Sequence, residues 1–101
     1  MAQPKVRIVW TKRATRHLRA AYEYWLREQS EDAADLMLDR IFSLAELLEQ
    51  YPDMGRPGRI TETRELVVRP LPFVLAYRVK SKRIEILALL HGSRKWPTKF
   101  D

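Results

Sequence analysis

The chain has 101 residues, a length typical of one domain, and 46% of them are hydrophobic, which is enough for a modest core and argues against general disorder. It contains no cysteine, which excludes disulfide bonds and thiolate metal sites. Nineteen lysines and arginines against thirteen acidic residues give a formal net charge of +6, so we expect an anionic partner.

The first half of the chain predicts one strand followed by two helices. Val6, Ile8 and Trp10 alternate with Lys5, Arg7 and Val9, which predicts a short first strand. Residues 12–27 place apolar side chains at helical spacing opposite a basic side, and Thr11 is their expected N-cap. Ser30 precedes two acids and predicts the start of a second helix, which should run to about Tyr51, where Pro52 stops it. The short connection predicts an antiparallel helical hairpin.

The second half predicts a loop and three strands. Residues 52–58 contain two prolines and two glycines, as loops do. The hydrophobic period then becomes two in the segments 65–69, 73–80 and 84–90, with a tight turn at residues 81–82. We therefore predict one α+β domain over residues 1–101, of order strand–helix–helix–strand–strand–strand. Two helices should cover one face of a four-stranded sheet whose last three strands form an antiparallel meander, and residues 93–101 could form a flexible tail.

An apolar strip is expected on the other face of the sheet. If Ile84, Ile86, Ala88 and Leu90 face the helices, then residues 87 and 89 point away from them, beside residue 74 or 76 of the neighbouring strand. A strip left uncovered on so small a domain is typical of a partner site. The alternative is that a C-terminal segment folds back over it, and both possibilities stay open.

Charge is unevenly distributed along the chain. Residues 1–27 carry a net charge of +6, residues 28–51 of −6, and residues 52–101 of +6. A basic surface beside an acidic helix indicates an oriented electric field, although an ordinary solvated surface would have a similar composition.

Several segments together resemble the RelE/ParE superfamily of bacterial toxins. They are Trp10-Thr11, an alanine-rich basic helix with Tyr-Trp near its end, Leu-Leu-Glu-Gln-Tyr-Pro at 47–52, Gly-Arg-Pro-Gly at 55–58, residues 63–68, residues 72–79, and Leu-His-Gly-Ser-Arg-Lys-Trp-Pro at 90–97. The resemblance extends over residues 6–97 and is greatest to the ParE branch. It implies a cytoplasmic toxin of a type II toxin–antitoxin, or plasmid stabilisation, system that an antitoxin neutralises in a hetero-oligomer. No signal peptide or membrane span is expected, since the longest apolar run is residues 86–90.

The two branches share a fold but not a target. ParE-type members inhibit DNA gyrase by binding, and RelE-type members cleave messenger RNA on the ribosome. The position at which the resemblance places a catalytic arginine of RelE-type nucleases is Val74 here, and no tyrosine follows Tyr77. Both departures favour a gyrase inhibitor that is not itself an enzyme. If the protein were a nuclease, its candidate catalytic residues would be Arg64, His91 and Arg94.

The remaining candidate residues belong to binding surfaces. In ParE toxins the C-terminal end bears on toxicity, so Arg94, Lys95 and Trp96 are the expected target contacts. The expected antitoxin contacts lie on the face away from the helices: Val74, Arg78, Leu87 and Leu89.

Structural roles are weighed for the other polar residues. Arg64 can pair with Glu65 or Glu62 or can contact an anion near the open end of the sheet, and both possibilities stay open. His91 is favoured as a structural residue that closes its strand, and His17 as a packed side chain. No metal site and no cofactor are expected. The further alternatives are a simple nucleic-acid-binding module and an inactive toxin.

Overall fold

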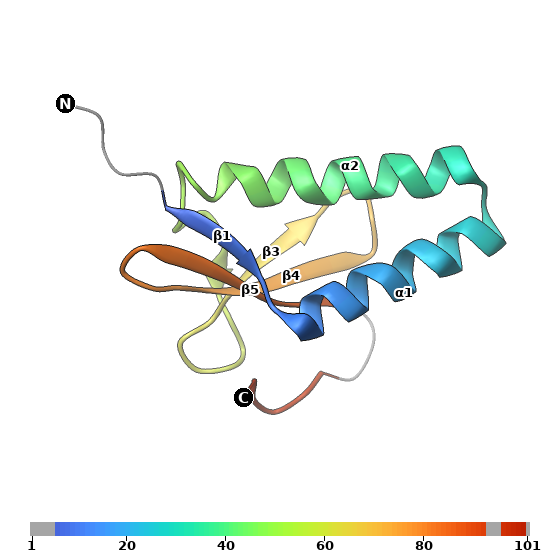
Figure 1. Cartoon of the computed structure of the whole chain (residues 1–101). Helices are drawn as coiled ribbons and strands as arrows, with labels where there is room; N and C mark the ends of the chain where they lie inside the picture. The colour runs from blue at the N-terminus through green and yellow to red at the C-terminus, as the bar shows by residue number, and fades with distance from the viewer. Residues whose placement is uncertain (1–5, 93–95, 101) are drawn as a thin grey trace.

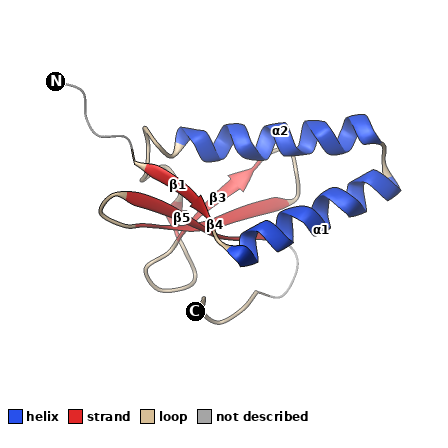
Figure 2. Ribbon diagram, viewed as in Figure 1, coloured by secondary structure: helices blue, strands red, loops and turns tan. Residues whose placement is uncertain are grey.

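The computed structural model describes residues 6–92 and 96–100. Its elements are β1 (Arg7–Trp10), α1 (Lys12–Glu28), α2 (Glu31–Leu47), β2 (Arg56–Pro57), β3 (Arg64–Val68), β4 (Phe73–Val79) and β5 (Arg83–His91). All five strands belong to one sheet in the order β1-β5-β4-β3-β2. The two helices form a hairpin that lies against one side of this sheet (Figures 1 and 2). The predicted α+β class is confirmed.

The sheet is mixed and has one more strand than the sequence predicts. Strands β3, β4 and β5 form the expected antiparallel meander, and β1 lies parallel to β5 at one edge. At the other edge, Arg56 and Pro57 pair with Glu65 and Arg64, so the prediction of a plain loop over residues 52–58 is wrong. Proline is tolerated in this short strand because an edge position does not require its missing N–H.

Both helices begin where the sequence predicts. The side chains of Thr11 and Ser30 accept hydrogen bonds from the backbone N–H groups of Ala14 and Ala33, at 3.2 and 3.0 Å. Helix α2 ends at Leu47 and not at Tyr51, because the N–H groups of residues 48–50 bond carbonyls three residues earlier instead of four. Such tightening is common in the last turn of a helix, and it precedes Pro52.

A β-bulge in β5 changes the side of the sheet to which the side chains beyond it point. The register passes from Ala76↔Ala88 to Tyr77↔Ile86, which leaves Leu87 as the extra residue. Beyond the bulge the alternation is inverted, so Leu89 packs into the core on the helix side. The prediction that Leu89 points away from the helices, and that Ala88 and Leu90 point toward them, is therefore wrong.

The main core lies between the helices and the sheet. Strands β3, β4 and β5 supply the residues of its sheet side, and α1 and α2 close it from above. Its buried members are Ala14, Met37, Ile41, Leu44, Ala45, Leu48, Val68, Leu75, Tyr77, Ile84, Ile86 and Leu89.

The face of the sheet away from the helices is also covered. Val74, Ala76, Leu87 and Ala88 are all buried, so the prediction of an uncovered apolar strip is wrong. The segment 96–100, red-brown in Figure 1, runs back from the end of β5 on the lower side of the molecule, where the loop 58–63 also lies. This arrangement agrees with the alternative in which a C-terminal segment folds back. Of the described residues, none forms a helix long and apolar enough to cross a membrane.

Candidate functional site

The C-terminal segment meets two arginines from distant parts of the chain. The guanidinium of Arg59 lies 3.5 Å from the centroid of the Trp96 indole, and that of Arg13 lies 5.2 Å from the centroid of the Phe100 ring. Both are cation–π contacts, which are strongest with tryptophan. The predicted target contact Trp96 is thus held against the loop 58–63. Arg94 and Lys95, predicted beside it, lie outside the described residues.

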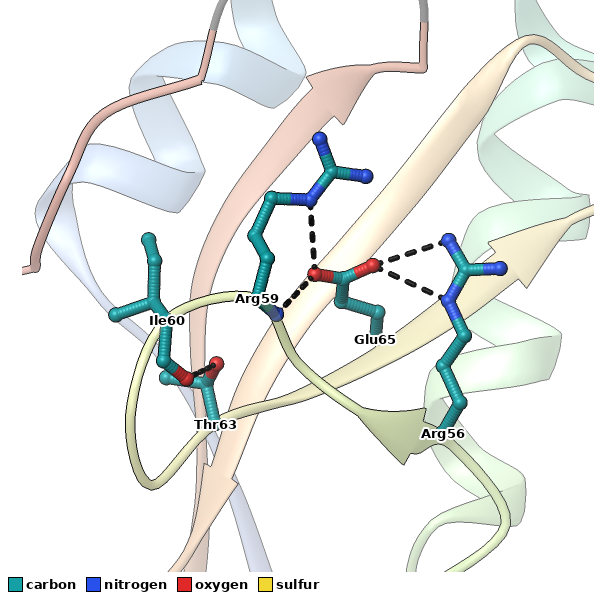
Figure 3. A network of polar contacts seen from close by, with 5 residues as sticks. All are labelled: Arg56, Arg59, Ile60, Thr63 and Glu65. Carbon is teal, nitrogen blue, oxygen red and sulfur yellow. Dashed lines mark hydrogen bonds and ion pairs between the residues drawn. The ribbon is translucent and has the colours of Figure 1, made fainter.

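A buried carboxylate on β3 holds Arg59 in place (Figure 3). Oε2 of Glu65 accepts hydrogen bonds from the backbone N–H and Nε of Arg59, at 2.8 and 3.2 Å. Oε1 accepts from Nε and Nη2 of Arg56, at 3.2 and 3.0 Å. Burial alone would raise the pKa of Glu65, but these hydrogen bonds outweigh it and hold that pKa below its ordinary value. Glu65 is therefore an ionised anchor on the sheet face away from the helices.

Arg64 has structural partners at one end of the sheet. Its Nη1 donates to the carbonyl of Gly55 at 2.7 Å, and its Nη2 lies 3.6 Å from a carboxylate oxygen of Asp53. The prediction that it pairs with Glu65 or Glu62 is wrong, because alternation along β3 directs Glu65 to the other face. Arg64 thereby connects β3 to the loop that follows α2.

His91 lies at the opposite end of the sheet from Arg64. It is paired with Phe73, whose ring it meets edge-on with 6.2 Å between centroids, whereas Arg64 is paired with Tyr77. Phe73 and Tyr77 are four positions apart along β4, which corresponds to about 13 Å at 3.3 Å per residue. The structure does not bring Arg64 and His91 together. The third nuclease candidate, Arg94, is not among the described residues.

The predicted antitoxin contacts fall into two groups. Val74, Leu87 and Leu89 are all buried, at 5%, 3% and 5% of their accessible surface. Arg78 is only partly buried, and its Nε donates to a carboxylate oxygen of Glu85 at 2.6 Å. Glu85 also accepts from Arg83 at 2.9 Å, and these two hydrogen bonds lower its pKa. Little of these three apolar side chains is therefore available for direct contact with an antitoxin.

A groove that the sequence did not predict lies between α1 and the ends of β4 and β5. It has a volume of about 640 Å³. Its lining includes the aromatic side chains of Tyr24 and Trp25 from α1 and Phe73 from β4, with the imidazoles of His17 and His91. Tyr24 is 54% exposed. Leu89 and His91, which the β-bulge turns toward α1, are part of this lining, and sequence periodicity carries no signal for a bulge.

His17 connects this groove to the core. Its Nδ1 accepts a hydrogen bond from the backbone N–H of Leu89 at 3.2 Å, so it is a packed residue, as predicted. Burial, followed by the nearby charges of Arg13 and Arg16, lowers its pKa. In the part of the chain that the structure describes, no three histidine, aspartate or glutamate side chains gather as metal ligands would.

Known proteins of similar sequence and structure include proteins named as toxins and a solved toxin–antitoxin system. Residues 8–96 match the family model of the ParE toxin of type II toxin–antitoxin system, parDE. The Sinorhizobium fredii protein Y4kP is 42% identical over 91 residues, covering 90% of this chain and 93% of its own. Toxin RelE2 of Caulobacter vibrioides is 38% identical over 87 residues, covering 86% and 96%. A solved structure of the chromosomal ParDE TA system from P. aeruginosa superimposes with a TM-score of 0.81 at 26% identity, covering 88% of this chain and 98% of that one.

Proposed function

The chain belongs to the ParE toxin family of type II toxin–antitoxin systems, and we propose that it acts by binding DNA gyrase and inhibiting it without catalysing a reaction. Membership of the family makes it the toxin component of such a system, with an antitoxin as its partner. The gyrase target and the surfaces described below are the proposal.

The observation that carries the proposal is the dispersal of the nuclease candidates. Metal-free RNA cleavage needs a base, an acid and cations within reach of one phosphate. Arg64 is tied to Gly55 and Asp53, and His91 lies at the other end of β4 against Phe73. By resemblance a RelE-type nuclease has an arginine at residue 74, and here that residue is a buried valine. A valine side chain cannot stabilise the charge that develops on a cleaved phosphate.

Trp96 is the proposed centre of the gyrase contact. Tryptophan and arginine are enriched among residues that dominate binding energy at protein interfaces. Trp96 and Arg59 form such a pair on the surface opposite the helices. Arg94 and Lys95 precede Trp96 in the chain and complete the proposed contact.

The groove beside α1 is the proposed antitoxin contact. It offers aromatic and apolar side chains, Arg27 is part of its lining, and the charges of Arg13 and Arg16 lie near His17 at the same groove. An antitoxin segment with an apolar face and acidic residues complements both features. Arg78 remains a proposed second contact, at the rim of the opposite face.

The second candidate is a ribosome-dependent ribonuclease that uses Arg64, His91 and Arg94. It is retained because two relatives, RelE2 and RelE3 of Caulobacter vibrioides, carry RelE names at 38% and 37% identity. Induction of the toxin in bacterial cells separates the two functions. A gyrase poison produces broken chromosomal DNA and leaves messenger RNA intact. A RelE-type nuclease instead cuts messenger RNA, and His91→Gln should abolish this cleavage. Cut RNA with intact DNA would contradict the proposal.

A further inference from the structure

Glu65 is a buried carboxylate, and each of its two oxygens accepts hydrogen bonds from an arginine. Its side chain is 3% exposed, although it lies on the sheet face opposite the main core. Its two arginine partners are about half exposed, Arg56 at 55% and Arg59 at 49%. Burying a carboxylate is costly unless it is paired and hydrogen-bonded. The arrangement therefore favours one fixed geometry of these three side chains.

The loop that carries Arg59 is closed by its own hydrogen bonds. The backbone N–H of Gly58 donates to the carbonyl of Thr63 at 2.7 Å, and the hydroxyl of Thr63 donates to the carbonyl of Ile60 at 2.6 Å. Figure 3 shows Arg59 leaving this closed loop toward Glu65. Because its backbone N–H and Nε both bond the same carboxylate oxygen, the direction of the Arg59 side chain is determined by Glu65.

Trp96 is the next residue in this chain of contacts. Its indole face lies against the guanidinium of Arg59. The Nε1 atom of the indole is buried, and no described residue accepts a hydrogen bond from it. A buried N–H without an acceptor disfavours the docked position, so other contacts of the side chain, with the Arg59 contact among them, offset this cost.

We infer that Glu65, acting through Arg59, is a positioning residue that fixes Trp96 for contact with the target. This inference rests on the proposed function, because it assigns to Trp96 the central role in target binding. A side chain held in its binding geometry before association loses less conformational entropy on binding. Without the carboxylate, Arg59 would lose its ion pair and the acceptor of both its backbone N–H and its Nε, and Trp96 would lose its oriented partner.

A structural experiment tests the positioning directly, without any target. The full-length protein is labelled with 5-fluorotryptophan, and its three fluorine resonances are assigned with Trp10→Phe, Trp25→Phe and Trp96→Phe. We expect Glu65→Gln to shift or broaden the Trp96 resonance and to leave the other two unchanged. Arg59→Gln should do the same while Glu65 keeps its pair with Arg56, so loss of the fold cannot explain both results. A Trp96 resonance unaltered in both variants would overturn the inference.

Glu85→Gln is the matched control. Glu85 lies on the same face, is also mostly buried, and also binds two arginines, Arg78 and Arg83. Among the described residues, the cation–π partner of Trp96 is Arg59 and neither of these two arginines. The control should leave the Trp96 resonance in place, and an equal shift in Glu85→Gln would overturn the inference, since any lost charge would then have the same effect.

A functional experiment then relates this position to activity. We expect Glu65→Gln and Arg59→Gln to raise the concentration needed for half-inhibition of gyrase by about tenfold, the effect of losing a modest preorganisation. Arg59→Lys keeps a cation for the ring and should recover part of the loss. If Trp96→Ala weakens inhibition and Glu65→Gln does not, the inference fails. If Trp96→Ala itself has no effect, the proposed target contact fails, and the fluorine spectra still decide whether Glu65 positions the indole.

Discussion

The Tyr77 hydroxyl accepts a hydrogen bond from the backbone N–H of Gly55 at 2.9 Å, joining the centre of the sheet to the loop that follows α2. The same hydroxyl donates to the carbonyl of Pro52 at 2.8 Å. Tyr77 is fully buried, and a Cβ at residue 55 would lie 2.6 Å from its hydroxyl oxygen. Glycine is therefore required at this close approach.

Replacing Tyr77 with phenylalanine should destabilise the protein. The ring would still fill its place in the core, but the buried N–H of Gly55 would lose its acceptor, which costs about 1–3 kcal/mol. Urea unfolding of Tyr77→Phe measures this loss in the free energy of unfolding. Tyr51→Phe is the control, since Tyr51 is 57% exposed. Equal stability of the two variants would show that the hydroxyl does not hold the loop.

The stability of the protein should fall as the pH decreases below 6.5. The pKa of His17 is lower in the folded protein than its ordinary value of 6.5, so the unfolded chain binds a proton more readily. The stabilisation is complete above pH 6.5 and is lost as the pH falls through the folded pKa. Urea midpoints between pH 7.5 and 5.5 measure the effect. Over this range Glu65 and Glu85, whose folded pKa values lie below 4.5, stay ionised.

A variant without this histidine identifies the source of the pH dependence. His17→Gln keeps a possible acceptor for the N–H of Leu89 but does not titrate. Its urea midpoint should change less than that of the unaltered protein over the same pH range. An identical pH dependence in both proteins would assign the effect to another group.

Leu89→Ala should lower the free energy of unfolding by about 2–5 kcal/mol, as deletion of a buried leucine side chain does. The β-bulge at Leu87 places Leu89 in the core, where the sequence pattern alone predicts a surface position. Leu36→Ala is the control, with a side chain 68% exposed and an expected change below about 0.5 kcal/mol. Thermal and urea unfolding of both variants test the assignment, which a small loss in Leu89→Ala would contradict.

Tyr24→Ala should weaken antitoxin binding by about tenfold, corresponding to loss of one moderate interface residue. Tyr24 is exposed in the groove beside α1. Titration calorimetry with the cognate antitoxin measures the dissociation constant. Tyr51→Ala removes another exposed tyrosine that does not line the groove and should bind as tightly as the unaltered toxin. Unchanged affinity in Tyr24→Ala would place the antitoxin on another surface.

Local sequence signals were sufficient for the helices and the meander. Thr11 and Ser30 are good N-caps, and the change of hydrophobic period from helical to alternating is clear along the chain. The bulge at Leu87 could not be predicted, because it adds one residue without changing the apolar composition of β5. This one extra residue was enough to move the side chains of Leu89 and His91 to the opposite side of the sheet.

The contacts of Trp96 depend on tertiary structure in the same way. Trp96 is an evident candidate for binding, but nothing local shows that it meets Arg59, 37 residues earlier in the chain. The sequence signal for the contacts of Glu65 was the presence of two arginines, Arg56 and Arg59, shortly before the strand that carries this glutamate. Recognising it required the register of β2 and β3, which a two-residue strand does not reveal in sequence.

The most direct test of the central claim is a gyrase supercoiling assay on relaxed plasmid with the purified toxin, with and without antitoxin. We expect inhibition or trapped cleaved DNA with the toxin alone, reversal by the antitoxin, and weaker inhibition by Trp96→Ala. The absence of any effect at micromolar concentration, from a preparation that still arrests bacterial growth, would contradict the account and direct attention to translating ribosomes.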